Sequence, residues 1–97
     1  MPTYVNLVNW TEQGIKNFRD TVRRADDFRG LVEKSGGQVR QLLWTLGQYD
    51  LVLVTDYPDD ETATAVALQT GALGNIRTTT MKAFDAEQMS GIIQQTG

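Results

Sequence analysis

The sequence predicts an α+β protein of the ferredoxin-like class, in which two helices cover one face of an antiparallel four-stranded sheet. Strand-like and helix-like segments alternate in the order β-α-β-β-α-β, and one further C-terminal helix follows. The 97 residues, of which 40% are apolar, are enough for a single compact domain over 1–97. A lone domain of this size is only marginally stable, so self-association would help it.

The first strand is expected over Tyr4–Trp10, which is rich in β-favouring residues. Thr11 can cap the amphipathic helix that follows, and Gly36-Gly37 should end it. The apolar positions of this helix recur in steps of three and four, at Ile15, Phe18, Val22, Ala25, Phe28 and Val32. If the helix bends, we expect the bend around residues 24–27.

The second and third strands are expected over Val39–Leu46 and Asp50–Tyr57, joined by a tight turn at Gly47-Gln48. A second helix should open at Pro58-Asp59 and run to about Leu73, with acidic residues near its positive N-terminal end. Its side chains are small, so we expect helix and sheet to approach closely.

The fourth strand is expected over Ile76–Phe84. Asp85, with Gln88 three residues further on, forms a capping-box pattern, which predicts a last helix through Ile93. Right-handed crossovers would place both main helices on one face of the sheet and make the first and third strands central.

The other face of the sheet should remain apolar. In the third strand, Leu51 and Leu53 point one way while Val52 and Val54 point the other, so this strand favours burial on both faces. The same face of a second copy, related by a two-fold axis, is the simplest cover. Two sheets packed in this way form a dimeric α/β barrel, and a cavity between them is the expected ligand site.

Composition and charge exclude several classes of function. The formal net charge is −3 and the pI is near 4.7, which argues against a nucleic-acid partner. The chain has no Cys and no His, so it lacks disulfides, thiolate metal sites and the Ser–His–Asp triad, and we expect no metal site and no cofactor. No apolar run is long enough to cross a bilayer, and Met1-Pro2-Thr3 lacks the basic start of a secretory signal. We therefore expect a cytoplasmic protein with no membrane partner.

Four stretches together resemble the GYD-domain family: YVNLVNWTEQGIKN, LGQYDLVLVTDYPDDETA, ALGNIRTTTMKAF and EQMSGII. The Gly-Tyr-Asp signature of that family is present as Gly47-Gln48-Tyr49-Asp50, with one residue inserted. Members more often carry Glu-Ala-Pro where this chain has Asp56-Tyr57-Pro58. The resemblance implies a small bacterial protein of the dimeric α/β-barrel type that forms a homodimer or higher homo-oligomer, and it leaves the biochemical role open.

Two acidic residues near the ends of the third strand are candidates for a site. The carboxylate of Asp50 could accept backbone N–H bonds at the hairpin turn, or it could be a polar member of a ligand site. Asp56 lies deeper in the strand, where a carboxylate needs a partner, and Arg77 is the partner that we expect. That ion pair could be structural or could orient a ligand. Asp50 and Asp56 share a face because they are six residues apart, whereas the register decides whether Asn6 and Arg77 join them.

Aromatic side chains supply the other candidates. Trp10 could stack on a ligand, but Trp10 and Trp44 also fit a role as anchors in the core or in a dimer interface. The hydroxyl groups of Tyr4 and Tyr49 could donate to a substrate carbonyl, or their rings could simply line the rim of a barrel. The candidate ligand-binding residues are therefore Asn6, Trp10, Tyr49, Asp50, Asp56 and Arg77, and no catalytic residue is assigned.

Three functions fit these residues. The first is a homo-oligomer whose inter-sheet cavity binds a small, partly apolar molecule, oriented by Asp56 and Arg77. The second is an enzyme similar to the cofactor-free monooxygenases and small isomerases of the same architecture, in which a confined cavity desolvates the substrate. The third is a pure assembly module whose core is filled by side chains. The fold class alone does not choose among them.

Overall fold

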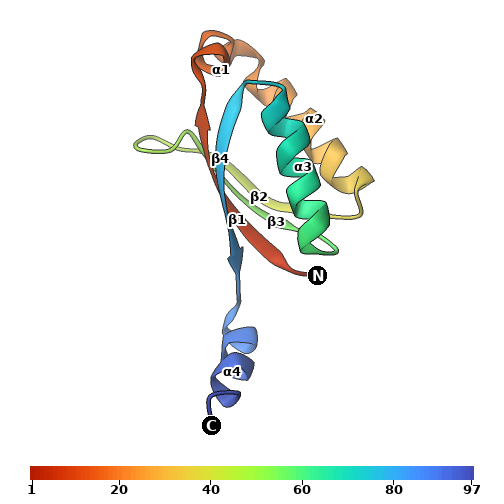
Figure 1. Cartoon of the computed structure of the whole chain (residues 1–97). Coiled ribbons are helices and arrows are strands. Elements are labelled where there is room, and N and C mark those ends of the chain that lie inside the picture. The colour runs from red at the N-terminus through yellow and green to blue at the C-terminus, as the bar shows by residue number, and fades with distance from the viewer.

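The computed structural model describes residues 1–97 in full (Figure 1). The strands are β1 (Thr3–Trp10), β2 (Gln38–Trp44), β3 (Leu51–Asp56) and β4 (Ile76–Ala83). The helices are α1 (Glu12–Lys16), α2 (Thr21–Lys34), α3 (Asp60–Ala72) and α4 (Ala86–Gln94), with a 3₁₀ helix, η1 (Phe18–Asp20), between α1 and α2. The predicted order of elements is confirmed, except that the first helix is divided into three segments.

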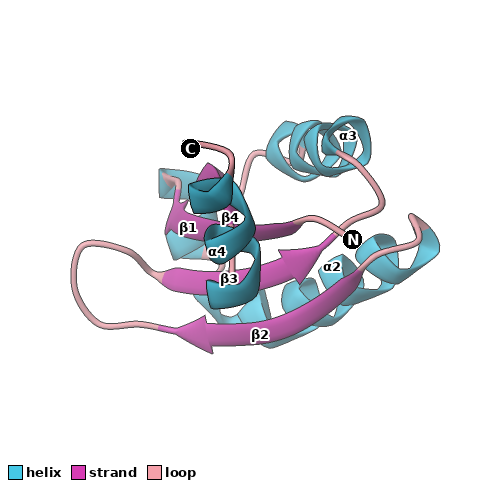
Figure 2. Cartoon of the chain, turned by 90° about the horizontal axis from the view of Figure 1, so that it is seen from below, coloured by secondary structure: helices cyan, strands magenta, loops and turns pink.

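The four strands form one antiparallel sheet in the order β2-β3-β1-β4, so β1 and β3 are central as predicted. The helices α2 and α3 lie over the same face of this sheet, whereas α4 projects past its end (Figures 1 and 2). This arrangement confirms the α+β, ferredoxin-like class. None of the helices combines the length and the hydrophobicity that crossing a membrane requires.

The first helix breaks earlier than expected. α1 ends at Lys16, with Asn17 as its C-cap, and α2 then runs without interruption through residues 24–27, where we had placed a possible bend. The guanidinium of Arg24 reaches back across the break and donates to the backbone oxygens of Asn17 (3.0 Å) and Gly14 (3.3 Å). Because the break resets the helical period, the first half of the predicted apolar stripe does not face the sheet. Its exposed members are Ile15, Phe18 and Val22.

The connection between β2 and β3 is longer than the two-residue turn that we predicted, because residues 45–50 all lie outside the strands. Thr45 closes this hairpin loop: its N–H donates to the backbone oxygen of Asp50 (2.8 Å), and its hydroxyl donates to that of Tyr49 (2.6 Å). Gly47 has a φ of +130°, a backbone conformation that residues other than glycine rarely adopt. The loop projects from the sheet on the side away from α2 and α3 (Figure 1).

The last two helices begin where predicted. Asp59 caps α3 by accepting from the N–H of Thr62, and Gly74, with a φ of +84°, lies just past the end of this helix. Asp85 and Gln88 form the predicted capping box at the start of α4. No residue of α4 is buried.

The core lies between the sheet and the pair α2 and α3. One cluster joins the rings of Tyr4 and Tyr57 to Val32, Ala63 and Val66. The second cluster consists of Val8, Leu51 and Leu53. Only 12 of the 97 residues are buried although 40% of the chain is apolar, so a single copy leaves much apolar surface exposed.

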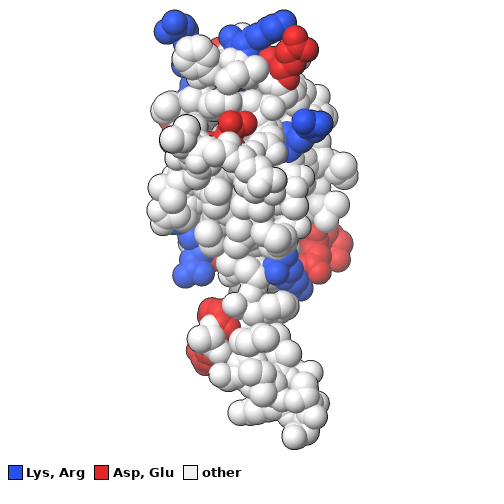
Figure 3. All heavy atoms as spheres, turned by 90° about the vertical axis from the view of Figure 1, so that its left-hand side faces the viewer, with Lys and Arg blue, Asp and Glu red and all other residues white.

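Much of that surface is on the sheet face that α2 and α3 do not cover, which we call the open face. Its apolar side chains are half-buried or exposed, and no element of the same chain lies over them. They are Val5, Leu7, Leu43, Val52, Val54 and Met81. Figure 3 shows this side of the molecule, with charged side chains mainly around its edge and uncharged atoms over most of its centre. The prediction of an apolar, uncovered face is confirmed for a single chain.

Candidate functional site

A cavity of about 180 Å³ lies between the sheet and the helices α2 and α3. Its walls are mostly apolar and include Val8, Leu51, Leu53, Phe28, Leu31, Ala63 and Ala67. We expected the small side chains of α3 to bring helix and sheet close together. Instead, the alanines of α3 border the cavity, and their short side chains leave it unfilled.

A row of polar side chains crosses the sheet on the cavity side. Register places Asn6 of β1 opposite Thr80 of β4, and Thr55 of β3 lies on its other side. The Asn6 amide nitrogen donates to the Thr55 hydroxyl (3.0 Å), and the Thr80 hydroxyl donates to the Asn6 amide oxygen (3.0 Å). An amide has two donor hydrogens and an acceptor oxygen with two lone pairs, so Asn6 keeps one donor and one acceptor position for a ligand.

Tyr57 extends the polar row. Its ring lines the cavity, and it shares this face with the fully buried Thr55, two residues before it. Burial raises the pKa of Tyr57, while the Thr55 hydroxyl opposes that rise, so the Tyr57 hydroxyl is protonated at neutral pH. No buried side-chain nitrogen or oxygen lacks a hydrogen-bond partner. Each buried polar atom of the row therefore has at least one partner before any ligand enters, while Asn6 keeps its second donor and acceptor positions.

Tyr4 anchors the sheet to α3 beside this row. Its hydroxyl donates to the Asp60 carboxylate, and its ring meets that of Tyr57 edge-to-face, with the centroids 5.6 Å apart. Burial, together with the hydrogen bond to Asp60 and its negative charge, raises the pKa of Tyr4 to about 12. The same hydrogen bond and the Lys82 ammonium, 3.2 Å away, hold the pKa of Asp60 below its usual value. The Tyr4 hydroxyl is therefore engaged in a contact that joins the sheet to α3.

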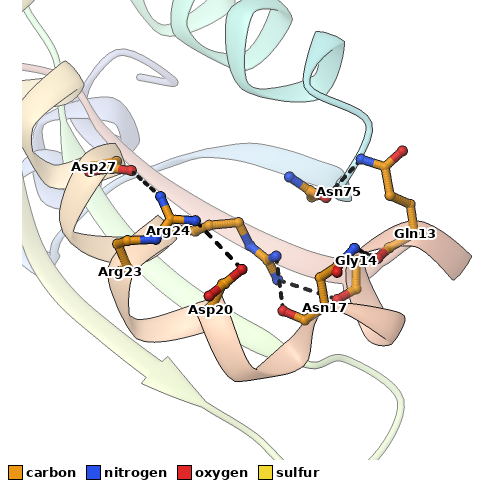
Figure 4. Close-up of polar contacts among 8 residues, drawn as sticks. All are labelled: Gln13, Gly14, Asn17, Asp20, Arg23, Arg24, Asp27 and Asn75. Carbon is orange, nitrogen blue, oxygen red and sulfur yellow. Dashed lines mark hydrogen bonds and ion pairs between the residues drawn. The ribbon is translucent and has the colours of Figure 1, made fainter.

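α1 meets the loop before β4 at a junction where polar side chains of both segments lie side by side (Figure 4), and Asn75 of this loop also lines the cavity. A Cβ atom on Gly14 would lie 2.0 Å from the backbone oxygen of Asn75, so only glycine permits this close approach. The Gln13 side chain donates to the Asn75 side chain (2.9 Å) and so fixes the same junction. The charged groups on this rim are already in use, because Arg24 donates to backbone oxygens and Asp27 pairs with Arg23 at 3.4 Å.

Of the six candidate residues named from the sequence, Asn6 and Trp10 line the cavity. Tyr49 and Asp50 belong to the hairpin loop instead. The Asp50 carboxylate accepts from the backbone N–H of Trp10 (2.8 Å), and the Asp50 N–H donates to the backbone oxygen of Val8 (2.8 Å). This geometry supports the structural interpretation of Asp50, as a brace between the loop and the end of β1.

The expected ion pair between Asp56 and Arg77 does not form. Both residues are on the open face, but Asp56 lies at the end of the sheet where β1 begins and Arg77 at the end where β1 finishes. Asp56 instead accepts from Thr3 (2.6 Å) and Gln38 (3.0 Å), and the Arg40 guanidinium is 3.6 Å away. Burial acts to raise the pKa of Asp56, but these two hydrogen bonds and the Arg40 charge outweigh it, so the pKa lies below its usual value.

Three polar residues beside Asn6 were not on the list of candidates: Thr55, which bonds to Asn6, and Tyr57 and Thr80, which line the cavity. These residues could have been found from the alternation of side chains between the two faces of a strand. Leu51, Leu53, Thr55 and Tyr57 share one face, and polar residues that interrupt such an apolar face mark a place where hydrogen bonds are needed.

The family model for the GYD domain matches residues 4–93. The chain belongs to the GYD-domain family. No curated protein sequence matches this GYD-domain protein. The match confirms the resemblance carried by the four quoted stretches and covers nearly the whole chain, including α4 as far as Ile93.

Solved structures with similar folds include TTHA0845 from Thermus thermophilus, with a TM-score of 0.57 and 25% identity over 89% of this chain and 96% of that one. MtbAldR has a TM-score of 0.68 and 15% identity over 87% of the GYD-domain chain, which spans 52% of the length of MtbAldR. A mutant of MhuD with two manganese protoporphyrin IX molecules bound per active site has a TM-score of 0.55 and 16% identity, over 89% and 95% of the two chains. At 15 and 16% identity, the likeness to MtbAldR and MhuD shows the fold alone.

Proposed function

We propose that this GYD-domain protein binds a small, mostly apolar molecule in the cavity between its sheet and the helices α2 and α3. The observation that carries the proposal is the polar row, with Asn6 at its centre, along one wall of an otherwise apolar space of about 180 Å³. Apolar pockets with a few well-placed polar groups are typical ligand sites. This site lies on the opposite side of the sheet from the inter-sheet cavity that the sequence led us to expect.

The size and charge of the cavity narrow the class of ligand. A dry apolar cavity of roughly 150 Å³ is enough for benzene, so this cavity suits a ring-sized molecule. The rim charges at Arg24 and Asp27 are occupied by contacts within the chain, which favours a neutral ligand. The free donor and acceptor of Asn6 would pair with one hydroxyl or carbonyl group on the ring.

The active form in this proposal is a homodimer with the two open faces packed together, which gives the dimeric α/β barrel. The apolar centre of the open face supports it, because contiguous exposed apolar surface marks sites of association. The barrel interior would then hold Asp56 and Arg77, and the ligand cavity of each copy would lie outside the barrel, under its own helices.

Binding is better supported than catalysis or assembly alone. The cavity wall has no free acid or base, since Asp27 is ion-paired and burial raises the pKa of Tyr57. A pure assembly module would have its core filled by side chains, whereas this core contains unfilled space.

Fluorine NMR with two probes of matched shape tests the proposed site. We expect 4-fluorophenol to bind more tightly than fluorobenzene, because its hydroxyl can pair with Asn6. In Asn6→Leu the preference should fall by about fivefold, which corresponds to roughly 1 kcal/mol for one hydrogen bond. Ala67→Leu, which fills the cavity, should abolish the binding of both probes, whereas Ala65→Leu on the exposed side of α3 should not. Equal binding of both probes to wild type, or binding that survives Ala67→Leu, would overturn the site.

A further inference from the structure

The helix α4 is well formed but has nothing of its own chain over it. It is nine residues long and starts with a complete capping box, yet none of its residues is buried. Helices shorter than about 12 residues are marginal in water without tertiary contacts. The helix stands beyond the end of the sheet, and with it the molecule reaches 52 Å in its longest dimension (Figure 1). Stable folding of α4 therefore requires a cover from outside the chain.

The C-terminal arm, residues 84–97, has a surface suited to association. Its large apolar side chains are exposed, with Phe84 at 53%, Met89 at 48% and Ile93 at 58% exposure. Its only charged side chains are acidic, Asp85 and Glu87. A matching surface must therefore be apolar and carry a basic group.

The opposite end of the open face has both properties. Arg77 lies on that face at the start of β4, is exposed, and takes part in none of the five ion pairs within the chain. The hairpin loop, which is at the same end of the sheet, projects on the open side (Figure 1) and carries the fully exposed Leu46. Arg77 on the edge strand β4 and Leu46 in the loop between β2 and β3 thus lie at the same end of the sheet, Arg77 without an ion pair and Leu46 without a cover from its own chain.

We propose that two copies of this chain exchange their C-terminal arms, each α4 docking against the hairpin loop and Arg77 of the other copy. The inference rests on the homodimer of the proposed function and adds the relative orientation of its two copies. The two-fold axis would cross the strands, so that the end of β4 in one copy lies over the start of β4 in the other. Each copy both gives and receives an arm, as a closed two-fold assembly requires.

In this arrangement, Met89 and Ile93 of one arm cover Leu46 of the other copy, and Glu87 faces Arg77. The charge complementarity favours a second copy over an unrelated partner, because the acidic arm and the unpaired basic residue belong to the same chain. Packing the two open faces about this axis also brings each arm to the end of the interface at which the hairpin loop of the other copy projects.

Disulfide cross-linking is a direct test, because the natural chain has no cysteine. Full-length Leu46→Cys and Met89→Cys variants are mixed, allowed to exchange, and oxidised. We expect a cross-linked heterodimer from the mixture at a yield at least tenfold above either variant alone. Ala65→Cys, on the exposed side of α3, mixed with Met89→Cys is the matched control and should give no such product.

A charge-reversal pair provides the second readout. Arg77→Glu and Glu87→Lys should each weaken the dimer several-fold, and a mixture of the two variants, or the double variant, should restore it. Sizing of the wild type separates the two proposals: a monomer at micromolar concentration overturns both the dimer and the arm exchange. A dimer in which Leu46 and Met89 do not cross-link above the control overturns the arm exchange and leaves the dimer standing.

Discussion

The two faces of the sheet are made from the same strands but carry different kinds of side chain. In β1, Asn6 and Val8 point toward the helices and contribute to the cavity wall, whereas Val5 and Leu7 point to the open face. On the helix side, the hydrogen-bonded polar row stands among apolar residues. The helices α2 and α3 cover this face but leave a cavity above it. The open face has an apolar centre and no cover in the chain.

This difference teaches what each face needs in order to be stable. Each buried polar atom of the polar row on the helix side has a partner within the chain, so this face tolerates unfilled space beneath α2 and α3. The open face has no such row at its centre, where Val52 and Val54 stand beside Val5 and Leu7. Its stabilisation depends on removing apolar area from water, which only another molecule can do.

The largest effect should come from truncating the helix-side core. Leu53→Ala removes a side chain that is 5% exposed in the second core cluster, and we expect the free energy of unfolding to fall by about 3 kcal/mol. Urea denaturation measures this loss. Leu68→Ala, at a position 70% exposed on α3, is the control and should change stability by less than about 0.5 kcal/mol. A loss below about 1 kcal/mol for Leu53→Ala would mean that the helix side is not the principal core.

A charge at the centre of the open face should act on association and not on folding. Val54→Lys places an ammonium where the second copy is proposed to pack, and we expect the dimer to weaken about 100-fold, because the charge would be buried without a partner. Sedimentation velocity over a concentration series measures the shift, and thermal unfolding should change little at a concentration low enough for both proteins to be monomeric. Ala65→Lys on the exposed side of α3 should leave the dimer intact. An unchanged dimer in Val54→Lys would show that the open face is not the interface.

The smallest effect at neutral pH is expected for Tyr4→Phe, which removes the hydrogen bond to Asp60 and should cost about 1 kcal/mol. The pH dependence is more informative. The pKa of Tyr4 is raised from 10.0 to about 12 in the folded chain, so the contribution of its hydroxyl is fully present below pH 10 and is lost between pH 10 and 12. Urea denaturation in that window should show a smaller fall in stability for Tyr4→Phe than for wild type.

Local sequence patterns located the elements well where one residue type decides the local geometry. The caps at Asp59 and Asp85 and the glycine after α3 are in the predicted places, because capping depends on neighbours along the chain. The break at Asn17 was missed, since it depends on the distant Asn75, whose backbone approaches Gly14. The hairpin loop was predicted too short because Asp50 is held by Trp10 and not by the strand that it was assigned to.

The candidate site was only partly predictable for a similar reason. Parity along β3 fixes that Asp50 and Asp56 are on the same side, but the partner of Asp56 depends on the strand register, and the observed register places Arg77 at the far end of the sheet. Asn6 was a candidate, yet its hydrogen bonds to Thr55 and Thr80 follow from three strands meeting, which a linear pattern does not contain.

The order of strands and helices, the helix caps, the two-sided apolar strand and the absence of cysteine and histidine were determined by the sequence alone, because each depends on residue identity and short-range spacing. The cavity beneath α2 and α3, the pairing of Asp56 with Arg40, and the projection of α4 away from its own body were decided only by the tertiary structure. These features depend on distances between segments that are far apart along the chain, and such distances are set by how helices stand on a twisted sheet and by which side chains are too small to fill the space between them.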